Sequence, residues 1–143
     1  MTHPPLPHAP PLAAALEAAL YVDDLEAARH FYGMLLGLEE IACIPGRHAF
    51  FRLGPTVLLV FDPAATVIGS DNPDLPVPGH GAHGPGHFCF ACEAPQLALW
   101  HDRLIAMGIP IEADFHWPGG ARSLYFRDPA GNSLELAEPR LWD

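Results

Sequence analysis

The stretch RSLYFRDPAGNSLELAEP, residues 122–139, reads as two strands joined by a turn, and it decides the fold of this chain. Alternating apolar residues predict strands at Arg122–Arg127 and Ser133–Ala137, and the Asp-Pro and Gly-Asn pairs between them predict the turn. One residue breaks the apolar pattern, because Glu135 stands between Leu134 and Leu136. Since side chains alternate along a strand, we expect Glu135 to face away from the side that the two leucines cover.

The same pattern occurs earlier in the chain. HAFFR (48–52) overlays SLYFR (123–127), GPTVLL (54–59) overlays GNSLEL (131–136), and a shift of 70 residues aligns two further strands. The overlay pairs His48 with Ser123, Phe50 with Tyr125, Leu58 with Glu135 and Glu17 with His87. The sequence therefore predicts one βαβββ unit that is present twice.

The expected elements follow from turn signals and hydrophobic periodicity. In the first unit we predict a strand over 15–22, a helix that Asp23 caps and Gly37 ends, and strands over 38–44, 47–53 and 56–61. In the second unit we predict a strand over 87–92, a helix over 95–106 and a strand over 109–115 before the final hairpin. The chain then divides into a Pro-rich arm (1–12), module one (13–62), a Pro/Gly-rich connector (63–86) and module two (87–143).

Two curved half-sheets related by a pseudo-twofold axis would bring four equivalent corners together. The four corners are Glu17, Leu58, His87 and Glu135. Three of them carry metal-binding groups, and two carboxylates facing each other across a pocket favour a cation between them. One imidazole with two carboxylates suits Mn, Fe, Ni or Zn better than Mg or Ca.

The net charge of the chain excludes several classes of function. Seven basic residues stand against 17 acidic ones, giving a net charge of −10. Such a chain lacks the basic surface that nucleic acid or an anionic membrane requires. No apolar run reaches the roughly 20 residues of a membrane span, and no charged-then-apolar signal pattern opens the chain, so we expect a cytoplasmic protein.

The chain gives no indication of an organic cofactor. It contains no lysine, which excludes Schiff-base catalysis and a P-loop. A formal G-x-G-x-x-G match from Gly79 to Gly84 precedes a strand, whereas a dinucleotide-binding loop must follow one.

The segments LEAALYVDDLEAARHFYGMLLGL, GHFCFA and SLYFRDPAGNSLEL resemble the vicinal oxygen chelate superfamily. This superfamily includes glyoxalase I, extradiol dioxygenases, fosfomycin-resistance thiol transferases and bleomycin-resistance proteins. The resemblance covers residues 13–139 and implies an α+β fold. In that fold two βαβββ modules form a curved, incompletely closed mixed β-barrel with the helices outside.

The resemblance also implies roles for individual residues. Metal ligands would be Glu17, His87 and Glu135, with Leu58 in place of the fourth ligand of glyoxalase I. Three ligands with open positions resemble the dioxygenases and the fosfomycin-modifying enzymes. The residues implied around the substrate are Tyr125 and His48 as catalytic groups, and Ser123, Arg122, Leu58 and Phe50 as contacts.

Two functions remain open at this point. The first is a metalloenzyme that uses a divalent ion as a Lewis acid on a small oxygenated metabolite or xenobiotic, by dioxygenation, isomerisation, lyase chemistry or epoxide opening. The second is a metal-free protein that sequesters a drug, as the bleomycin-resistance members do. Many relatives are homodimers, and in some the site spans two chains, so we expect a homodimer.

Overall fold

The computed structural model describes residues 1–143, and its elements follow the order βαβββ twice. The first module consists of β1 (Glu17–Tyr21), α1 (Leu25–Arg29), the π-helix η1 (His30–Leu35), β2 (Glu39–Ile44), β3 (His48–Leu53) and β4 (Thr56–Phe61). A short helix, α2 (Pro63–Thr66), begins the connector. The second module consists of β5 (His87–Ala91), α3 (Ala94–Ala106), β6 (Ala113–His116), β7 (Arg122–Arg127) and β8 (Ser133–Ala137), followed by the 3-10 helix η2 (Pro139–Trp142).

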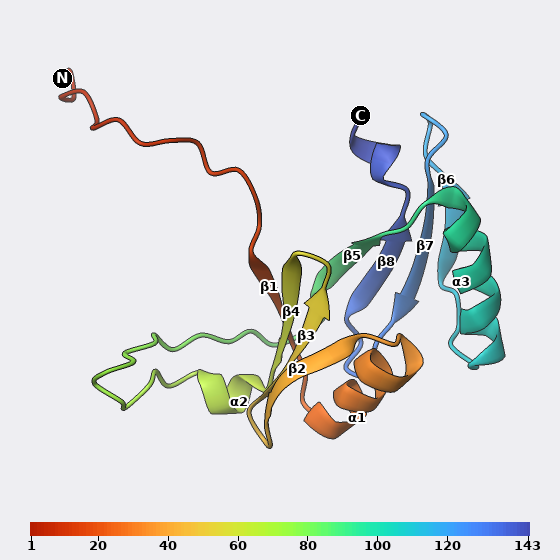
Figure 1. Ribbon diagram of the computed structural model, residues 1–143, viewed down its shortest axis with the longest axis horizontal. Helices are drawn as coiled ribbons and strands as arrows, with labels where there is room; N and C mark the ends of the chain where they lie inside the picture. The colour runs from red at the N-terminus through yellow and green to blue at the C-terminus, as the bar shows by residue number, and fades with distance from the viewer.

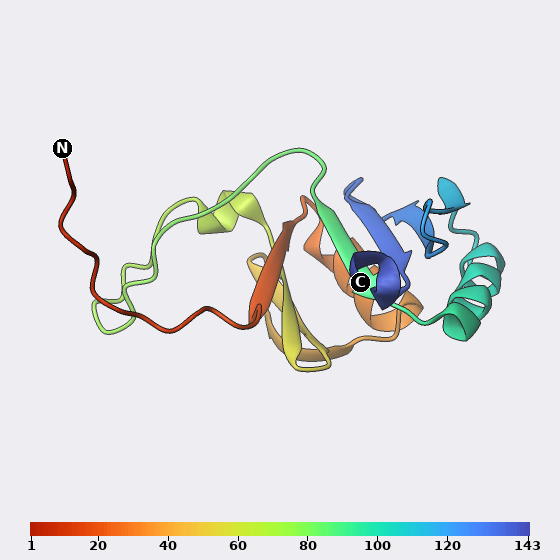
Figure 2. The same ribbon diagram turned by 90° about the horizontal axis from the view of Figure 1, so that it is seen from above.

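Each module forms one four-stranded mixed sheet, in the orders β1-β4-β3-β2 and β5-β8-β7-β6. The β1–β4 and β5–β8 pairs are parallel, and the other pairs are antiparallel. Figures 1 and 2 show the sheets next to each other, with β1 and β5 at their junction and α3 outside the second sheet. The predicted α+β fold of two βαβββ modules is confirmed, and the barrel stays open because no strand pair joins the sheets.

The first helix differs in detail from the prediction. Its N-cap is Asp24 and not Asp23. The helix then widens into a π-helical turn, where the N–H of Leu36 donates to the carbonyl of Phe31 at 2.9 Å. Gly37 ends it as expected, with a φ of 75° that a residue bearing a Cβ rarely adopts.

The two faces of β8 explain the carboxylate in the apolar run. Leu134 and Leu136 are buried in the core cluster. Glu135 points from the opposite face, because successive side chains of a strand alternate. On the neighbouring β5, Phe90 belongs to the same core, and His87 lies on the face that Glu135 shares. The predicted orientation of these two side chains is therefore confirmed.

The strand register corrects one predicted position. In module two, Glu135 pairs with Cys89 on β5 and with Tyr125 on β7. In module one, the residue with the equivalent pair of neighbours is Leu59, which pairs with Ala19 and Phe50.

Leu58, which we predicted at that corner, is instead fully buried in the core cluster and does not line the site. The sequence overlay slipped by one residue, and a one-residue slip exchanges the two faces of a strand.

The D-P-x-G-N turn between β7 and β8 connects the two modules. Asp128 Oδ2 accepts hydrogen bonds from the hydroxyl of Tyr32 at 2.7 Å and from Asn132 Nδ2 at 2.8 Å. Asn132 Nδ2 also donates to the carbonyl of Tyr21 at 3.0 Å, and its Oδ1 accepts from the N–H of Gly86 at 2.7 Å. Tyr32 and Tyr21 belong to module one, whereas Gly86 precedes β5. The turn therefore fixes the start of β5 against both β1 and β8.

A single apolar core lies beneath both sheets. Nineteen buried residues form one cluster that draws on η1, on both sheets and on α3. Phe31 of η1 and Phe126 of β7 lie 6.4 Å apart between ring centroids, so side chains of the two modules pack against each other. None of the helices combines the length and the apolarity that crossing a bilayer demands.

We predict that Tyr32→Phe lowers the free energy of unfolding by about 1–3 kcal/mol, because it removes a buried donor to the Asp128 carboxylate. Burial and the neighbouring Asp128 raise the pKa of Tyr32, so its hydroxyl stays a donor at every ordinary pH. Urea denaturation measures the change. Tyr21→Phe is the matched control. The hydroxyl of Tyr21 bonds the partly exposed His80, so its removal should lower the free energy of unfolding by less. Equal losses in the two variants would contradict the cross-linking role of Asp128.

Candidate functional site

The side chains of His87 and Glu135 meet on the concave face of the second sheet. His87 Nε2 lies 3.2 Å from Glu135 Oε1. The histidine side chain is 52% exposed and the glutamate side chain only 6%. Solvent therefore reaches the pair from the side of the imidazole, while the carboxylate is fixed below it.

The backbone orients the imidazole of His87. Its Nδ1 lies 2.9 Å from the carbonyl oxygen of Ser133, which can only accept a hydrogen bond. This contact assigns the hydrogen to Nδ1 and turns the Nε2 lone pair toward Glu135. A histidine whose second nitrogen donates to a backbone carbonyl is the usual arrangement of a metal ligand. Two acceptors that face each other call for a cation between them, either a proton or a metal ion.

A short hydrogen-bond chain holds the carboxylate of Glu135. The hydroxyl of Ser123 donates to Glu135 Oε2 at 2.7 Å, and the indole N–H of Trp117 donates to that hydroxyl at 2.8 Å. Oε1 is thereby left for His87 and for a cation. Ser123, predicted as a substrate contact, bonds Glu135 in the structure. The sequence did not indicate the part played by Trp117, which reaches Ser123 from the turn after β6.

Aromatic rings form one wall of the site. The ring of Tyr125 lies nearly parallel to His87, with 6.1 Å between centroids, and nearly parallel to Phe115, at 5.9 Å. Burial, together with a hydrogen bond to Glu135, raises the pKa of Tyr125 to about 12. At neutral pH its hydroxyl can therefore donate a proton or a hydrogen bond, but it cannot act as a base.

The third predicted ligand, Glu17, does not join this pair within one chain. It lines an open cavity on the concave face of the first sheet, together with His48 and Phe50. No three histidine, cysteine, aspartate or glutamate side chains come together in a group that could hold a metal ion. A single chain thus offers two of the three predicted donors at one place.

His48 and Phe50 also belong to the first sheet. Their rings are stacked, with 4.0 Å between centroids. Burial, and then the charge of Arg47, lowers the pKa of His48, so this imidazole is neutral at physiological pH. Neither residue touches the His87–Glu135 pair.

Arg122, predicted as a substrate contact, lies elsewhere. Its guanidinium makes two hydrogen bonds of 2.8 Å to the carboxylate of Asp114. Alternation along β7 also directs it to the face opposite Ser123 and Tyr125. In the structure Arg122 pairs β6 with β7, and the substrate contact expected of it stays a prediction.

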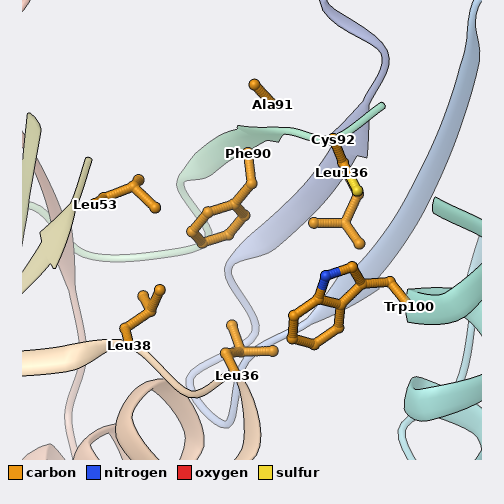
Figure 3. A pocket seen from close by; sticks show the side chains of 8 residues that line it. All are labelled: Leu36, Leu38, Leu53, Phe90, Ala91, Cys92, Trp100 and Leu136. Carbon is orange, nitrogen blue, oxygen red and sulfur yellow. The ribbon is translucent and has the colours of Figure 1, made fainter. Parts of the chain in front are cut away.

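A second, wholly apolar pocket lies where the two modules meet (Figure 3). Its volume is about 150 Å³, and Trp100 of α3, Phe90 of β5 and Leu36 after η1 point into it. It contains no titratable carboxylate or imidazole.

A family model of the Glyoxalase/Bleomycin resistance protein/Dioxygenase superfamily matches residues 14–136. No match was found among curated proteins. Among solved structures, the chain is similar to a lactoylglutathione lyase from Agrobacterium tumefaciens. The two share 44% identity at a TM-score of 0.85, over 92% of this chain and 98% of that one.

More distant structures share the fold alone. A glyoxalase/bleomycin resistance protein/dioxygenase from Nocardioides is 24% identical with a TM-score of 0.69, over 91% of this chain and 85% of that one. A superfamily member from Sphaerobacter thermophilus is 22% identical with a TM-score of 0.66, over 89% and 98% of the two chains.

The site predicts the reactivity of Cys89. Burial, and then the charge of Glu135, raises the pKa of this thiol to about 12, so almost no thiolate exists at pH 8. We expect iodoacetamide to alkylate Cys89 slowly in the presence of a chelator. Glu135→Gln removes the charge but not the burial, and should accelerate alkylation several-fold.

Peptide mapping by mass spectrometry measures this rate. Ser123→Ala is the matched control, because it removes a neighbour of Glu135 and leaves the carboxylate charge in place. The electrostatic account fails if the rate at Cys89 is the same in wild type and Glu135→Gln.

Proposed function

This chain belongs to the Glyoxalase/Bleomycin resistance protein/Dioxygenase superfamily, and we propose that it is a metal-dependent enzyme acting on a small oxygenated metabolite or xenobiotic. The observation that carries the proposal is the orientation of His87. Its Nδ1 is bound to a backbone carbonyl and its Nε2 faces the fixed oxygen of Glu135. That arrangement supports a metal ligand, because metal-binding histidines commonly donate their second nitrogen to a backbone carbonyl.

The donor set fits a divalent transition metal such as Mn, Fe, Ni or Zn. His87 and Glu135 would hold it, with Glu17 as the third donor. When bound, such an ion acts as a Lewis acid on the oxygen atoms of a substrate. The corner opposite Glu135 is Leu59, which has no donor atom, and this supports three protein ligands with open positions.

The other residues of the site then have distinct tasks. Ser123 and Trp117 keep the Glu135 carboxylate in one orientation, so that it need not reorganise during the reaction. Tyr125 supplies a proton or hydrogen bond to an oxygen of the substrate, and the ring of Phe115 packs nearly parallel to the Tyr125 ring. These roles suit dioxygenation, isomerisation, lyase chemistry and epoxide opening alike. Lactoylglutathione lyase activity, named for the Agrobacterium tumefaciens protein, is the first reaction to assay.

We infer further that the enzyme is a homodimer in which Glu17 comes from a second copy. Glu17 shares its cavity with Arg47 and His80, and neither His87 nor Glu135 lines that cavity. The second sheet leaves the imidazole of His87 half exposed and Phe115 37% exposed. Placing the first sheet of one copy over the second sheet of the other would cover this face and supply the missing donor.

One observation favours a second candidate, a metal-free protein that sequesters a drug. No three-donor group forms in the single chain, and the cavity of the first sheet is lined by the aromatic rings of Phe50 and Phe61. Glu17 would then be a carboxylate that waits for a cationic ligand.

We predict about one transition metal per chain in protein purified without a tag or chelator. Elemental analysis should find it lost in His87→Ala and Glu135→Gln, because each removes a donor atom of the pair. The matched controls are His101→Ala and Glu112→Gln, which change a partly exposed histidine and an exposed glutamate of module two. A metal-free wild type that also fails to bind added Mn, Fe, Ni or Zn would favour the sequestering protein.

A complementation experiment tests the shared site. Glu17→Gln and Glu135→Gln chains each lack a donor, and we expect each alone to be metal-free. In a mixed dimer, the intact Glu17 of one copy meets the intact His87 and Glu135 of the other, so about half the wild-type metal content should return. No recovery after subunit exchange, or a monomer by light scattering, would show that the site does not span two chains.

A further inference from the structure

The open cavity on the first sheet has features that a metal site does not require. It measures about 560 Å³, within the range of small-molecule sites. Strands β1, β3 and β4 form its floor, and the connector forms one wall. The charged and aromatic residues of its lining are Glu17, Arg47, His48, Phe50, Phe61 and His80.

Four rings enclose one end of this cavity. His48 and Phe50 are stacked, and Phe61 meets both of them edge to face, with centroid distances of 5.8 Å and 5.4 Å. His80 meets Phe61 at 4.6 Å, also edge to face. Rings that pack at right angles in the wall of a cavity offer both faces and edges to a flat guest.

The connector holds His80 firmly in this wall. Its Nδ1 lies 2.6 Å from the hydroxyl of Tyr21, and its backbone N–H donates to the carbonyl of Thr66 at 2.9 Å. The preceding Gly79 packs so closely that a Cβ would lie 2.3 Å from the carbonyl oxygen of Val67. The connector therefore needs glycine there to bring His80 over the cavity.

Arg47 is the one lysine or arginine that lines the cavity, and it belongs to no salt bridge. Four other arginines are paired with carboxylates: Arg29, Arg122, Arg127 and Arg140. Arg47 instead donates to Nδ1 of His48, and its guanidinium lies 5.9 Å from the centroid of Phe61. A guanidinium carries five N–H donors, so most of its donors remain free for an anion.

Glu17, which would repel an anion, lies at the far end of the cavity. Along β1, Glu17 lies four residue steps from Tyr21, which pairs with Phe61, and Phe61 in turn pairs with His48. Four residues of strand span about 13 Å. An acid group beside Arg47 is therefore well separated from Glu17, with the rest of a ligand directed along the strands toward it.

We propose that this cavity is a binding subsite for a planar, aromatic-type carboxylic acid. Arg47 takes the carboxylate, and His48, Phe50, Phe61 and His80 enclose the flat group. Binding of such an acid needs no metal. Only the further step, that this acid is the substrate class of the metal centre, rests on the function proposed above.

Benzoate is the probe for the subsite, and ligand-detected NMR titration of the protein as purified gives its Kd. Two analogues separate the contribution of the charge from that of the flat ring. Benzamide lacks the charge, and cyclohexanecarboxylate lacks the flat ring. We expect benzoate to bind about tenfold more tightly than benzamide, and several-fold more tightly than cyclohexanecarboxylate.

Arg47→Gln should weaken benzoate binding about tenfold and abolish the preference over benzamide. Arg52→Gln is the matched control, because Arg52 lies on β3, the strand that Arg47 directly precedes, is exposed and does not line the cavity. Should Arg47→Gln fail to fold, Arg47→Lys decides the matter: it keeps the charge but loses the planar fork, and should cost several-fold in affinity.

The proposed subsite would be overturned if the Arg47 and Arg52 variants changed the Kd of benzoate equally. It would also be overturned if the wild type did not prefer benzoate over benzamide. Repeating the titration after chelator treatment separates this proposal from the metal centre. Benzoate binding that survives metal removal supports the subsite whatever the fate of the metalloenzyme. Binding that disappears with the metal would show that benzoate binds the ion, and would overturn the subsite alone.

Discussion

The hydrogen bonds of the Asp128–Asn132 turn are the constraint on which the rest of the structure depends. The turn lies between β7 and β8, yet its side chains bond a tyrosine hydroxyl of η1, a carbonyl at the end of β1 and the N–H that precedes β5. Gly86 directly precedes His87, the first residue of β5. Asn132 lies two residues before Leu134 of β8. The same five-residue turn therefore fixes the module interface and the relative position of the two strands that carry the site.

The two modules share one topology, but their side chains at equivalent positions differ. In module two the equivalent corners hold an imidazole and a carboxylate, supported by Ser123 and Trp117. In module one the same corners hold Glu17 and Leu59, and the surrounding strand positions carry stacked rings. One concave face is thus polar and suited to an ion, and the other is aromatic with one uncommitted guanidinium. A dimer that faces the two surfaces toward each other would combine an ion with a flat acid.

Much of this arrangement could be predicted from the sequence, because alternation along strands is a local property. The positions of His87 and Glu135 on one face followed from the apolar residues around them. The error at Leu58 arose because Gly54 and Gly131 were treated as equivalent. The second hairpin turn is longer, since Arg127 pairs with Ser133 whereas Arg52 pairs with Val57. Contacts between segments far apart in the sequence could not be predicted from local alternation. Arg122 bonds Asp114 across a hairpin, and His80 bonds Tyr21 only because the connector folds back.

The most direct test of the account is anomalous diffraction from crystals of the protein grown with Mn²⁺ or Zn²⁺. The account predicts a peak beside Nε2 of His87 and the carboxylate of Glu135, with Nδ1 of His87 still bonded to the carbonyl of Ser133. A peak bound by other side chains, or an imidazole turned so that Nδ1 faces the ion, would contradict it.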